Sequence, residues 1–247
     1  TGIDISTFYI DKPGSSDTDL AVLIEAVNNI EGIERIRLGS LEVGLVTEAF
    51  IGRVSACSAF CPHFHLSLQS GSDGTLKRMN RHYTADEFYE TVQIIRKAFP
   101  DAGITTDIIA GFPGETEEEF EETKAFVNKV KFTQAHIFPY SRRKGTKADK
   151  MPGQLTKAVK EQRTGILINE ASAIQKEHLN DCIGKTVSVL AEEIIDRDGE
   201  SFAAGYTPEY IRVVFNGEEE FVNSIVTVNV TAVSDKFPDT LYGCINA

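Results

Sequence analysis

Short apolar runs alternate with amphipathic helical runs from residue 1 to about residue 130. Five runs predict strands, and each is followed by a stretch with helical periodicity. This alternation is typical of β/α units that form a parallel sheet. Because five units are too few for a closed eight-stranded barrel, the α/β pattern predicts a partial (β/α) TIM-like barrel without its first unit. The predicted strands are Gly2–Ile5, Arg35–Leu38, Phe64–Leu68, Ile104–Ala110 and Gln134–Phe138.

Capping signals mark the beginnings of the predicted helices. Thr84 and Thr116 are each followed three residues later by a glutamate, which is the pattern of a capping box. The acidic residues after Thr116 also complement the positive end of the helix dipole. The predicted helices run from the Ser16-x-x-Asp19 signal to about Asn29, from Thr47 over Glu48–Ser55, from Thr84 to the break at Pro100, and from Thr116 onward.

The pattern changes after Pro152-Gly153. Thr156–Ile183 has the period of one long helix, which ends at Gly184. From residue 185 onward, apolar and polar residues alternate in short runs between glycine-bearing turns, which predicts a small antiparallel barrel or a sandwich. We therefore predict two domains, an α/β domain over 1–183 and an all-β domain over 184–247.

Polar residues follow several of the predicted parallel strands. In β/α folds the carboxyl ends of the strands carry the chemistry. The turn Gln69-Ser70-Gly71 can bring backbone amides and hydroxyl groups close to a ligand. Single polar residues at these positions can also serve as helix caps. We predict a ligand site at the ends of the strands, formed from Asp4, Ser6, Ser40, Glu42, Gln69, Ser70, Asp107 and Tyr140.

Two further motifs leave alternatives open. The loop Gly111–Thr116 joins a strand to a helix N-terminus, which suits an anion or a flat ligand. It matches neither a Walker loop nor GxGxxG, so a tight turn is the alternative. Cys57, Cys61, His63 and His65 are the residue types that bind zinc. Their spacing matches no standard zinc pattern, which favours buried thiols.

The composition is that of an ordinary globular protein, with 247 residues, 41% of them apolar and 25% charged. Its four cysteines are too few and too scattered for a disulfide framework, so we expect a reducing compartment, the cytoplasm. No apolar run is long enough to span a membrane, and the chain opens without a signal-peptide pattern. It opens without a methionine on a strand-like run, so we expect a piece of a longer protein.

A net charge of −12 argues against a nonspecific binder of nucleic acid. An RNA partner would need a local basic patch, and Ser141–Lys147 offers four cations in seven residues, with a solvated loop as the alternative. The all-β domain has four basic and eleven acidic residues, a net charge of −7. Its aromatic residues Tyr206, Tyr210 and Phe215 either stack on single-stranded bases or fill the core.

Four runs, taken in chain order, resemble the radical S-adenosylmethionine methylthiotransferases. They are RLGSLE at 37–42, LSLQSGSD at 66–73 followed by LKRMNR at 76–81, TDIIAGFPGET at 106–116, and FPYS at 138–141 continued by KGT at 144–146. The resemblance covers nearly the whole chain. The all-β domain resembles the TRAM domain of that family.

Within the family, three segments resemble the subgroup that acts on threonylcarbamoyladenosine beside the tRNA anticodon. They are Phe64–Gly71, Ser141–Thr146 with Met151–Gln154, and Gly205–Tyr210. The sister subgroups modify isopentenyladenosine in tRNA or an aspartate of a ribosomal protein, and they are the alternatives.

The resemblance implies a transferase with two 4Fe-4S clusters. One cluster, reduced by an electron donor, cleaves S-adenosyl-L-methionine to a radical that abstracts hydrogen from the tRNA substrate. The second cluster supplies sulfur, and a second S-adenosylmethionine supplies the methyl group. The family places its CxxxCxxC triplet and three more cysteines upstream of the strand that begins here at Thr1. We therefore expect a fragment of the intact enzyme that holds no cluster and is inactive alone.

The resemblance also assigns roles to residues. It places Ser40, Glu42, Gln69 and Ser70 toward the polar parts of S-adenosylmethionine. Gly111 and Gly114 are expected near its adenine, with Arg81 and Asp107 close by. The residues expected to contact RNA are Arg142, Arg143 and Lys144. No catalytic residue and no metal ligand is predicted. Two rival interpretations remain, an enzyme of phosphorylated metabolites that uses Gly111–Thr116 as its phosphate loop, and a non-catalytic RNA-binding module.

Overall fold

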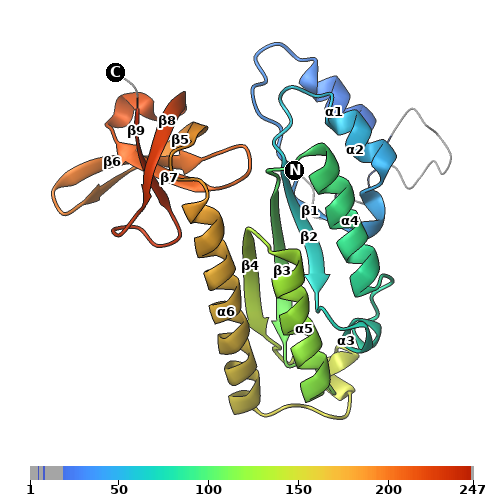
Figure 1. Ribbon diagram of the computed structural model, residues 1–247. Coiled ribbons are helices and arrows are strands. Elements are labelled where there is room, and N and C mark those ends of the chain that lie inside the picture. The colour runs from blue at the N-terminus through green and yellow to red at the C-terminus, as the bar shows by residue number, and fades with distance from the viewer. Residues whose placement is uncertain (1–4, 6–7, 9–18, 246–247) are drawn as a thin grey trace.

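The computed structural model describes Ile5, Phe8 and residues 19–245 of the 247-residue chain. A four-stranded parallel sheet with helices packed against one face forms the first part (Figure 1). A closed five-stranded barrel forms the second part, and a long helix leads from one to the other. The predicted fold class, a partial parallel β/α structure with an added all-β part, agrees with this architecture.

The parallel sheet has the order β1-β2-β3-β4, so each strand lies beside its neighbours in sequence. Its register places Phe64 opposite Ile104 and Thr106 opposite Ala135. The sheet is open, as the number of predicted units requires. Its strands are β1 (Ser40–Leu41), β2 (His63–Gln69), β3 (Gly103–Ala110) and β4 (Gln134–Pro139).

The helices begin where the capping signals predict. Thr84 Oγ1 accepts the Glu87 backbone N–H at 3.2 Å, and Glu87 Oε2 accepts the Thr84 N–H at 2.7 Å. The same reciprocal bonds join Thr116 and Glu119. The α-helices are α1 (Leu20–Asn28), α2 (Glu48–Val54), α3 (Asp73–Arg78), α4 (Ala85–Ala98), α5 (Glu117–Val130) and α6 (Lys157–Asn180), with short 3-10 turns η2 (Val43–Leu45) and η3 (Ala148–Lys150).

The first predicted units differ from the structure. Arg35–Leu38 is not a strand: it makes one isolated bridge, Ile36 to Phe60, and the sheet begins at Ser40. The segment is instead held by its arginines, which bind carbonyl groups of the barrel. Helix α1 begins at Leu20, where Asp19 accepts the Val22 N–H at 2.9 Å. The predicted strand Gly2–Ile5 lies outside the described residues except for Ile5, and Asp4, Ser6 and Ser16 lie outside them as well.

The two faces of the sheet have opposite character. Phe64, Leu66 and Ile104 are fully buried in the core beneath the helices. Because successive side chains of a strand point to opposite faces, the residues between them face away from α4 and α5. That second face is polar and carries His63, His65, Thr105, Asp107 and His136.

The all-β part is a closed barrel in the order β5-β6-β7-β9-β8, so the barrel alternative is confirmed. Its pairs are antiparallel except β7 with β9, which are parallel. Val189, Val213 and Phe215 are fully buried in its core, so Phe215 is a core residue and not a surface for stacking. The strands are β5 (Thr186–Arg197), β6 (Glu200–Tyr206), β7 (Arg212–Asn216), β8 (Ile225–Val233) and β9 (Leu241–Ile245), with a 3-10 turn, η4 (Glu219–Phe221).

The barrel lies beside the amino ends of the sheet strands (Figure 1). A Cβ added at Gly103, the first residue of β3, would lie 1.9 Å from the carbonyl oxygen of Glu209. This close approach of two backbones leaves room for glycine alone. Within the described residues, no helix has both the length and the apolarity needed to cross a bilayer.

Candidate functional site

The carboxyl end of the sheet brings two of the predicted ligand residues together. Glu42, which directly follows β1, lies 3.2 Å from Arg81, measured from Oε1 to Nη1. Both side chains are partly exposed. Gln69 ends β2 with a φ of 68°, which turns the chain sharply at this end of the sheet. Ser40 is exposed on β1 beside His65 of β2.

Ser70 differs from the expectation that its hydroxyl faces a ligand. Its side chain is fully buried, and its hydroxyl lies 3.2 Å from Thr123 Oγ1 on α5. The same oxygen accepts the Ser72 N–H at 3.2 Å. The Ser70 hydroxyl thus fixes the turn after β2 against α5. At the same turn, the Gln69 side chain is half-buried and stays partly accessible to solvent.

A buried hydroxyl without a partner lies at the end of β4. Tyr140 is 9% exposed, and its hydroxyl oxygen is buried with no hydrogen-bond partner among the described residues. Its ring meets the ring of Phe112 edge-on, with the centroids 5.3 Å apart. Because an unpaired buried hydroxyl is costly, this group is one that a bound ligand can satisfy.

The loop Gly111–Glu115 is filled by a side chain of its own. Glu115 is 3% exposed, and its Oε2 accepts the Gly111 N–H at 2.9 Å. Arg163 of α6 donates to the same oxygen at 2.7 Å and to the Glu115 carbonyl at 3.0 Å. Burial raises the pKa of the Glu115 carboxyl, while Arg163 and the Gly111 N–H oppose that rise.

This arrangement bears on both roles suggested for the loop. The Gly111 N–H already binds a carboxylate, and the Gly114 N–H donates to the Gly153 carbonyl at 2.9 Å. A phosphate at this loop would have to displace a buried carboxylate from its arginine, which argues against a phosphate loop. The adenine contact expected for Gly111 and Gly114 would therefore not use these two amides.

A chain of hydrogen bonds crosses the polar face of the sheet. His63 Nε2 and His65 Nδ1 each lie 2.9 Å from Thr105 Oγ1. His65 Nε2 lies 3.4 Å from Asp107 Oδ2. The sequence suggested that His63 and His65 share one side of a strand, but it gave no sign of Thr105, which is 40 residues or more away.

The single proton of Thr105 couples the two histidines. In a neutral His65 ring with its proton on Nε2, toward Asp107, Nδ1 can accept the Thr105 hydroxyl proton. The Thr105 oxygen can then accept a hydrogen bond from the Nε2–H group of His63. His63 Nδ1 is left with a bare lone pair, and this atom is buried with no partner among the described residues. Burial, with smaller contributions from Arg37 and His65, lowers the pKa of His63 to about 3, so its ring stays neutral.

The predicted stacking residues of the barrel form its junction with the sheet. The rings of Tyr206 and Tyr210 stack with centroids 4.5 Å apart, and His63 stacks on Tyr210 at 4.7 Å. The Arg37 guanidinium lies 4.4 Å from the centre of the Tyr210 ring. Arg35 donates to the Tyr206 carbonyl at 2.7 Å. These tyrosines therefore hold two parts of the chain together.

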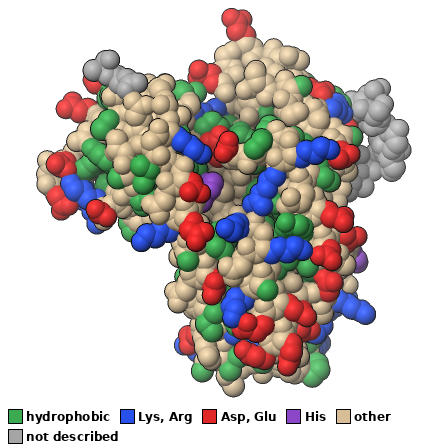
Figure 2. All heavy atoms as spheres, in the orientation of Figure 1, with side chains coloured by type: hydrophobic (Ala, Val, Ile, Leu, Met, Phe, Trp, Pro, Cys, Tyr) green, Lys and Arg blue, Asp and Glu red, His purple; other side chains and the backbone are tan. Residues whose placement is uncertain are grey.

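The basic loop is ordered by an acidic residue. Arg142 Nε lies 2.6 Å from Asp149 Oδ1, and Asp149 Oδ2 also accepts the Gly145 N–H at 3.3 Å. Arg143 and Lys144 are exposed. Elsewhere on the face shown in Figure 2, acidic and basic side chains are mixed. The loop thus presents three exposed cations, Arg143, Lys144 and Lys147, while the ion pair of Arg142 with Asp149 shapes it.

Three of the four cysteines are buried thiols, which favours a packing role over a role as metal ligands. Cys57, Cys61 and Cys182 are buried and Cys244 is exposed, all as free thiols. Burial raises the pKa of the Cys61 thiol, so the thiolate that binds metal is disfavoured there. In the part of the chain that the structure describes, no three His, Cys, Asp or Glu side chains are grouped to hold a metal ion.

Comparison with known proteins finds similar sequences over most of this chain. Residues 14–127 match the Radical SAM superfamily. The chain is 38% identical to the threonylcarbamoyladenosine tRNA methylthiotransferase MtaB of Bacillus subtilis over 85% of its own length and 47% of that protein. It is also 38% identical to the tRNA-2-methylthio-N(6)-dimethylallyladenosine synthase of Pelotomaculum thermopropionicum, over 87% of this chain and 48% of that one.

Among solved structures, the chain resembles the radical SAM enzyme coproporphyrinogen III oxidase (HemN) from Escherichia coli. The TM-score is 0.45 at 12% identity, over 71% of this chain and 46% of that one. The chain thus spans about half the length of the curated relatives it matches. Residues 14–127 thus match the Radical SAM superfamily, and most of the chain is homologous to proteins named as tRNA methylthiotransferases.

Proposed function

We propose that the protein adds a methylthio group to threonylcarbamoyladenosine beside the tRNA anticodon, using S-adenosylmethionine, in the cytoplasm. The observation that carries the proposal is the identity of 38%, over 85% of this chain, to a protein named for this reaction. The resemblance of Phe64–Gly71, Ser141–Thr146 and Gly205–Tyr210 to that subgroup supports the choice of nucleoside. Because the chain spans about half of its relative, the activity is proposed for the full product of the gene.

The residues at the carboxyl end of the sheet suit the polar parts of S-adenosylmethionine. Glu42 can accept from its ammonium group, and Arg81 can bind its carboxylate. Gln69 adds a carboxamide, and the unpaired Tyr140 hydroxyl gives a further buried partner. When bound, this cofactor supplies the hydrogen-abstracting radical and the methyl group. The described residues bind and orient it, and the buried pair Glu115–Arg163 keeps the loop Gly111–Glu115 fixed beside it.

The donor set for iron–sulfur clusters does not fit the residues described. A 4Fe-4S cluster takes cysteine thiolates, and here three of the four thiols are buried singly in the protein. No group of three ligands occurs among the described side chains. The described residues therefore offer no ligand set for the two clusters that the resemblance implies.

The tRNA contact is proposed for the basic loop and the barrel, which we propose is a TRAM-like domain. Arg143 and Lys144 are exposed, and the ion pair of Arg142 with Asp149 holds the loop between them. Phosphate contacts of this kind release counterions, so their loss weakens the salt dependence of binding. The Arg143→Gln, Lys144→Gln double variant should lower the salt slope of tRNA binding by about 1.4 to 1.8.

A second candidate substrate is dimethylallyladenosine in tRNA, because the identity to a synthase of its methylthio form is equally 38%. The polar residues at the carboxyl end of the sheet, Glu42, Gln69, Arg81 and Tyr140, form a polar mouth. This polar mouth and the basic loop serve either nucleoside. The difference between the two substrates lies in the group on the adenine nitrogen.

The decisive experiment is nucleoside mass spectrometry of total tRNA from the source organism with the gene intact, deleted and restored. The proposal requires that deletion removes the methylthio form of threonylcarbamoyladenosine while its unthiolated precursor accumulates. Loss of the methylthio group from dimethylallyladenosine instead would transfer the activity to the second candidate. An unchanged set of tRNA nucleosides would refute both.

A further inference from the structure

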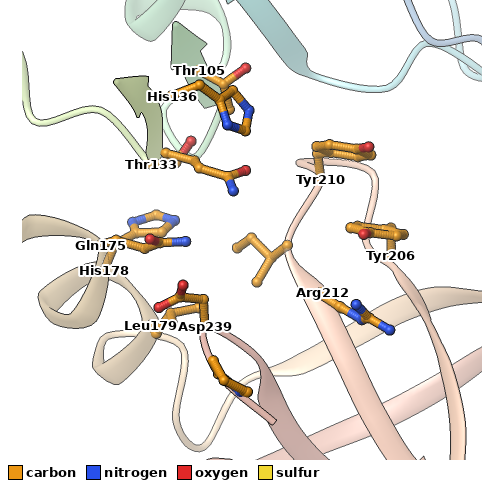
Figure 3. A pocket seen from close by; sticks show the side chains of 13 residues that line it. Thr105, Thr133, His136, Gln175, His178, Leu179, Tyr206, Tyr210, Arg212 and Asp239 are labelled. Carbon is orange, nitrogen blue, oxygen red and sulfur yellow. The ribbon is translucent and has the colours of Figure 1, made fainter. Parts of the chain in front are cut away.

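A cleft of about 340 Å³ lies between the amino ends of β3 and β4, the last turns of α6 and the barrel (Figure 3). His136 enters it from β4, and Gln175 and His178 reach it from α6. Tyr206 and Tyr210 form the opposite wall with their rings parallel. The volume lies in the lower part of the range of about 300–1,000 Å³ that is typical of small-molecule sites.

The wall of the cleft holds polar atoms that the protein itself does not satisfy. His178 Nε2 is buried and has no hydrogen-bond partner among the described residues. Burial lowers the pKa of His178, with Lys185 acting in the same direction, so its ring is neutral near pH 7 and offers one donor and one acceptor. Gln134 and Gln175 add carboxamides, which donate and accept at once. The cleft therefore suits a ligand with several donors and acceptors.

The charges of the cleft disfavour a phosphate as that ligand. Arg212 is the one lysine or arginine among the lining residues, and its Nη2 is already paired with Glu193 at 2.7 Å. Asp239 lies on the opposite side, and the segment 185–247 carries a net charge of −7. An uncharged, flat group is better matched to this surface. Carboxamides pair with the edges of nucleobases, and imidazole and phenol rings stack on their faces.

We infer that this cleft binds a single unpaired nucleobase of the RNA substrate, at a place separate from the polar mouth. The inference rests on the proposed function for the choice of RNA. Helix α6 has 24 residues and spans about 36 Å, so it separates the cleft from the segment that contains the basic loop by that length. A hairpin RNA is long enough to place phosphates on Arg143 and Lys144 and one looped-out base in the cleft.

The test uses the protein in the full length that its gene encodes and an anticodon stem–loop RNA with 2-aminopurine at one loop position at a time. One position should change fluorescence on binding in the wild type and lose that change in Gln175→Ala and His136→Ala. Loss of a stacking ring in His136→Ala and of hydrogen bonds to the base edge in Gln175→Ala predicts that each variant binds about tenfold more weakly. The salt slope should stay unchanged, unlike that of the Arg143→Gln, Lys144→Gln variant.

Gln162→Ala is the matched control, because Gln162 is an exposed residue of the same helix outside the cleft. It should bind the hairpin as the wild type does. Wild-type affinity and fluorescence in both cleft variants would overturn the inference. A weakened response to free adenosine monophosphate with unchanged hairpin binding would also overturn it, since the cleft would then serve a free nucleotide. Nucleoside analysis of cellular tRNA tests the proposed function separately, so either proposal can fail alone.

Discussion

The two ends of the parallel sheet are built from different kinds of contact. At the carboxyl end, local and distant contacts combine: Gly111 binds Glu115 four residues away, whereas Arg163 reaches the same carboxylate from 48 residues away. At the amino end, Arg35 binds the Tyr206 carbonyl, 171 residues along the chain. Local contacts thus shape part of the carboxyl end, whereas the junction and its cleft form only from segments far apart in the chain.

The difference extends to the exposure of the polar groups at each end and to the buried atoms without a partner among the described residues. The carboxyl end keeps Glu42 and Arg81 partly exposed and leaves the Tyr140 hydroxyl unpaired. The amino end buries His63 between the sheet and the barrel and leaves unsatisfied nitrogen atoms on His63 and His178. Each end therefore keeps buried polar atoms that have no partner among the described residues. The four predictions concern the contacts that hold the two ends in place.

The largest expected effect is at the closed loop of the carboxyl end. Arg163→Met leaves the buried Glu115 carboxylate without its partner, which should lower the free energy of unfolding by about 3–5 kcal/mol in urea titrations at pH 7. Removing the cation raises the pKa of Glu115 further in the folded variant. A raised folded pKa favours the fold at low pH, so the deficit should shrink as pH falls through it.

The control for this prediction removes both charges. The double variant Glu115→Gln, Arg163→Met has no buried carboxylate and should recover much of the loss at pH 7. A single variant that is as stable as the wild type at every pH would show that the loop does not depend on this ion pair.

The next effect concerns the junction at the amino end. Gly103→Ala places a methyl group against the Glu209 carbonyl, which should cost about 1–3 kcal/mol of unfolding free energy or part the barrel from the sheet. Gly165→Ala is the control, because Gly165 lies within α6 with open space around it. That change should stabilise the protein by up to about 1 kcal/mol. Equal stabilities of the two variants would contradict the close contact between barrel and sheet.

The third prediction concerns the pH dependence that His63 contributes. The pKa of His63 is about 3 in the folded protein and 6.5 ordinarily. Between these two values the unfolded chain binds a proton at His63 and the folded chain does not. Stability should therefore fall as pH drops from 6.5 toward 3, by up to about 1.4 kcal/mol per pH unit. His63→Phe keeps an aromatic ring beside Tyr210 and should flatten this slope in urea titrations across the same range. The same slope in the variant would exclude His63 as its source.

The smallest effect is expected at the N-cap of α4. Thr84→Ala removes the bond to the Glu87 N–H and should lower the unfolding free energy by about 1 kcal/mol. Thr84→Ser keeps the hydroxyl and should retain most of the stability. A loss of equal size in both variants would place the effect in the missing methyl group instead of the cap.

These contrasts explain which features the sequence can predict. Capping boxes and the turn at Gly111 depend on residues within five positions, so their patterns are visible in one chain. The strand at Arg35–Leu38 was predicted wrongly because its arginines bind a barrel that lies far away in sequence. Ser70 shows the same limit, since the burial of its hydroxyl depends on Thr123 in a later helix.

The candidate site follows the same division. Glu42 and Arg81 were predicted from the resemblance and lie together in the structure. The Thr105 bridge between His63 and His65 needed the register of β2 against β3, which a strand pattern alone leaves undetermined. The cleft needed three segments at once, from β4, α6 and the barrel, so no motif could indicate it.

The most direct test of the division between the two ends is hydrogen–deuterium exchange of the full-length gene product with each ligand alone. S-adenosylmethionine should protect backbone amides around 66–70, 107–115 and 138–140. The anticodon stem–loop RNA should protect 133–136, 175–179 and 206–212, together with the basic loop. If both ligands protected the same end of the sheet, or if RNA left the barrel junction unchanged, the assignment of the cofactor to one end and an RNA base to the other would be contradicted.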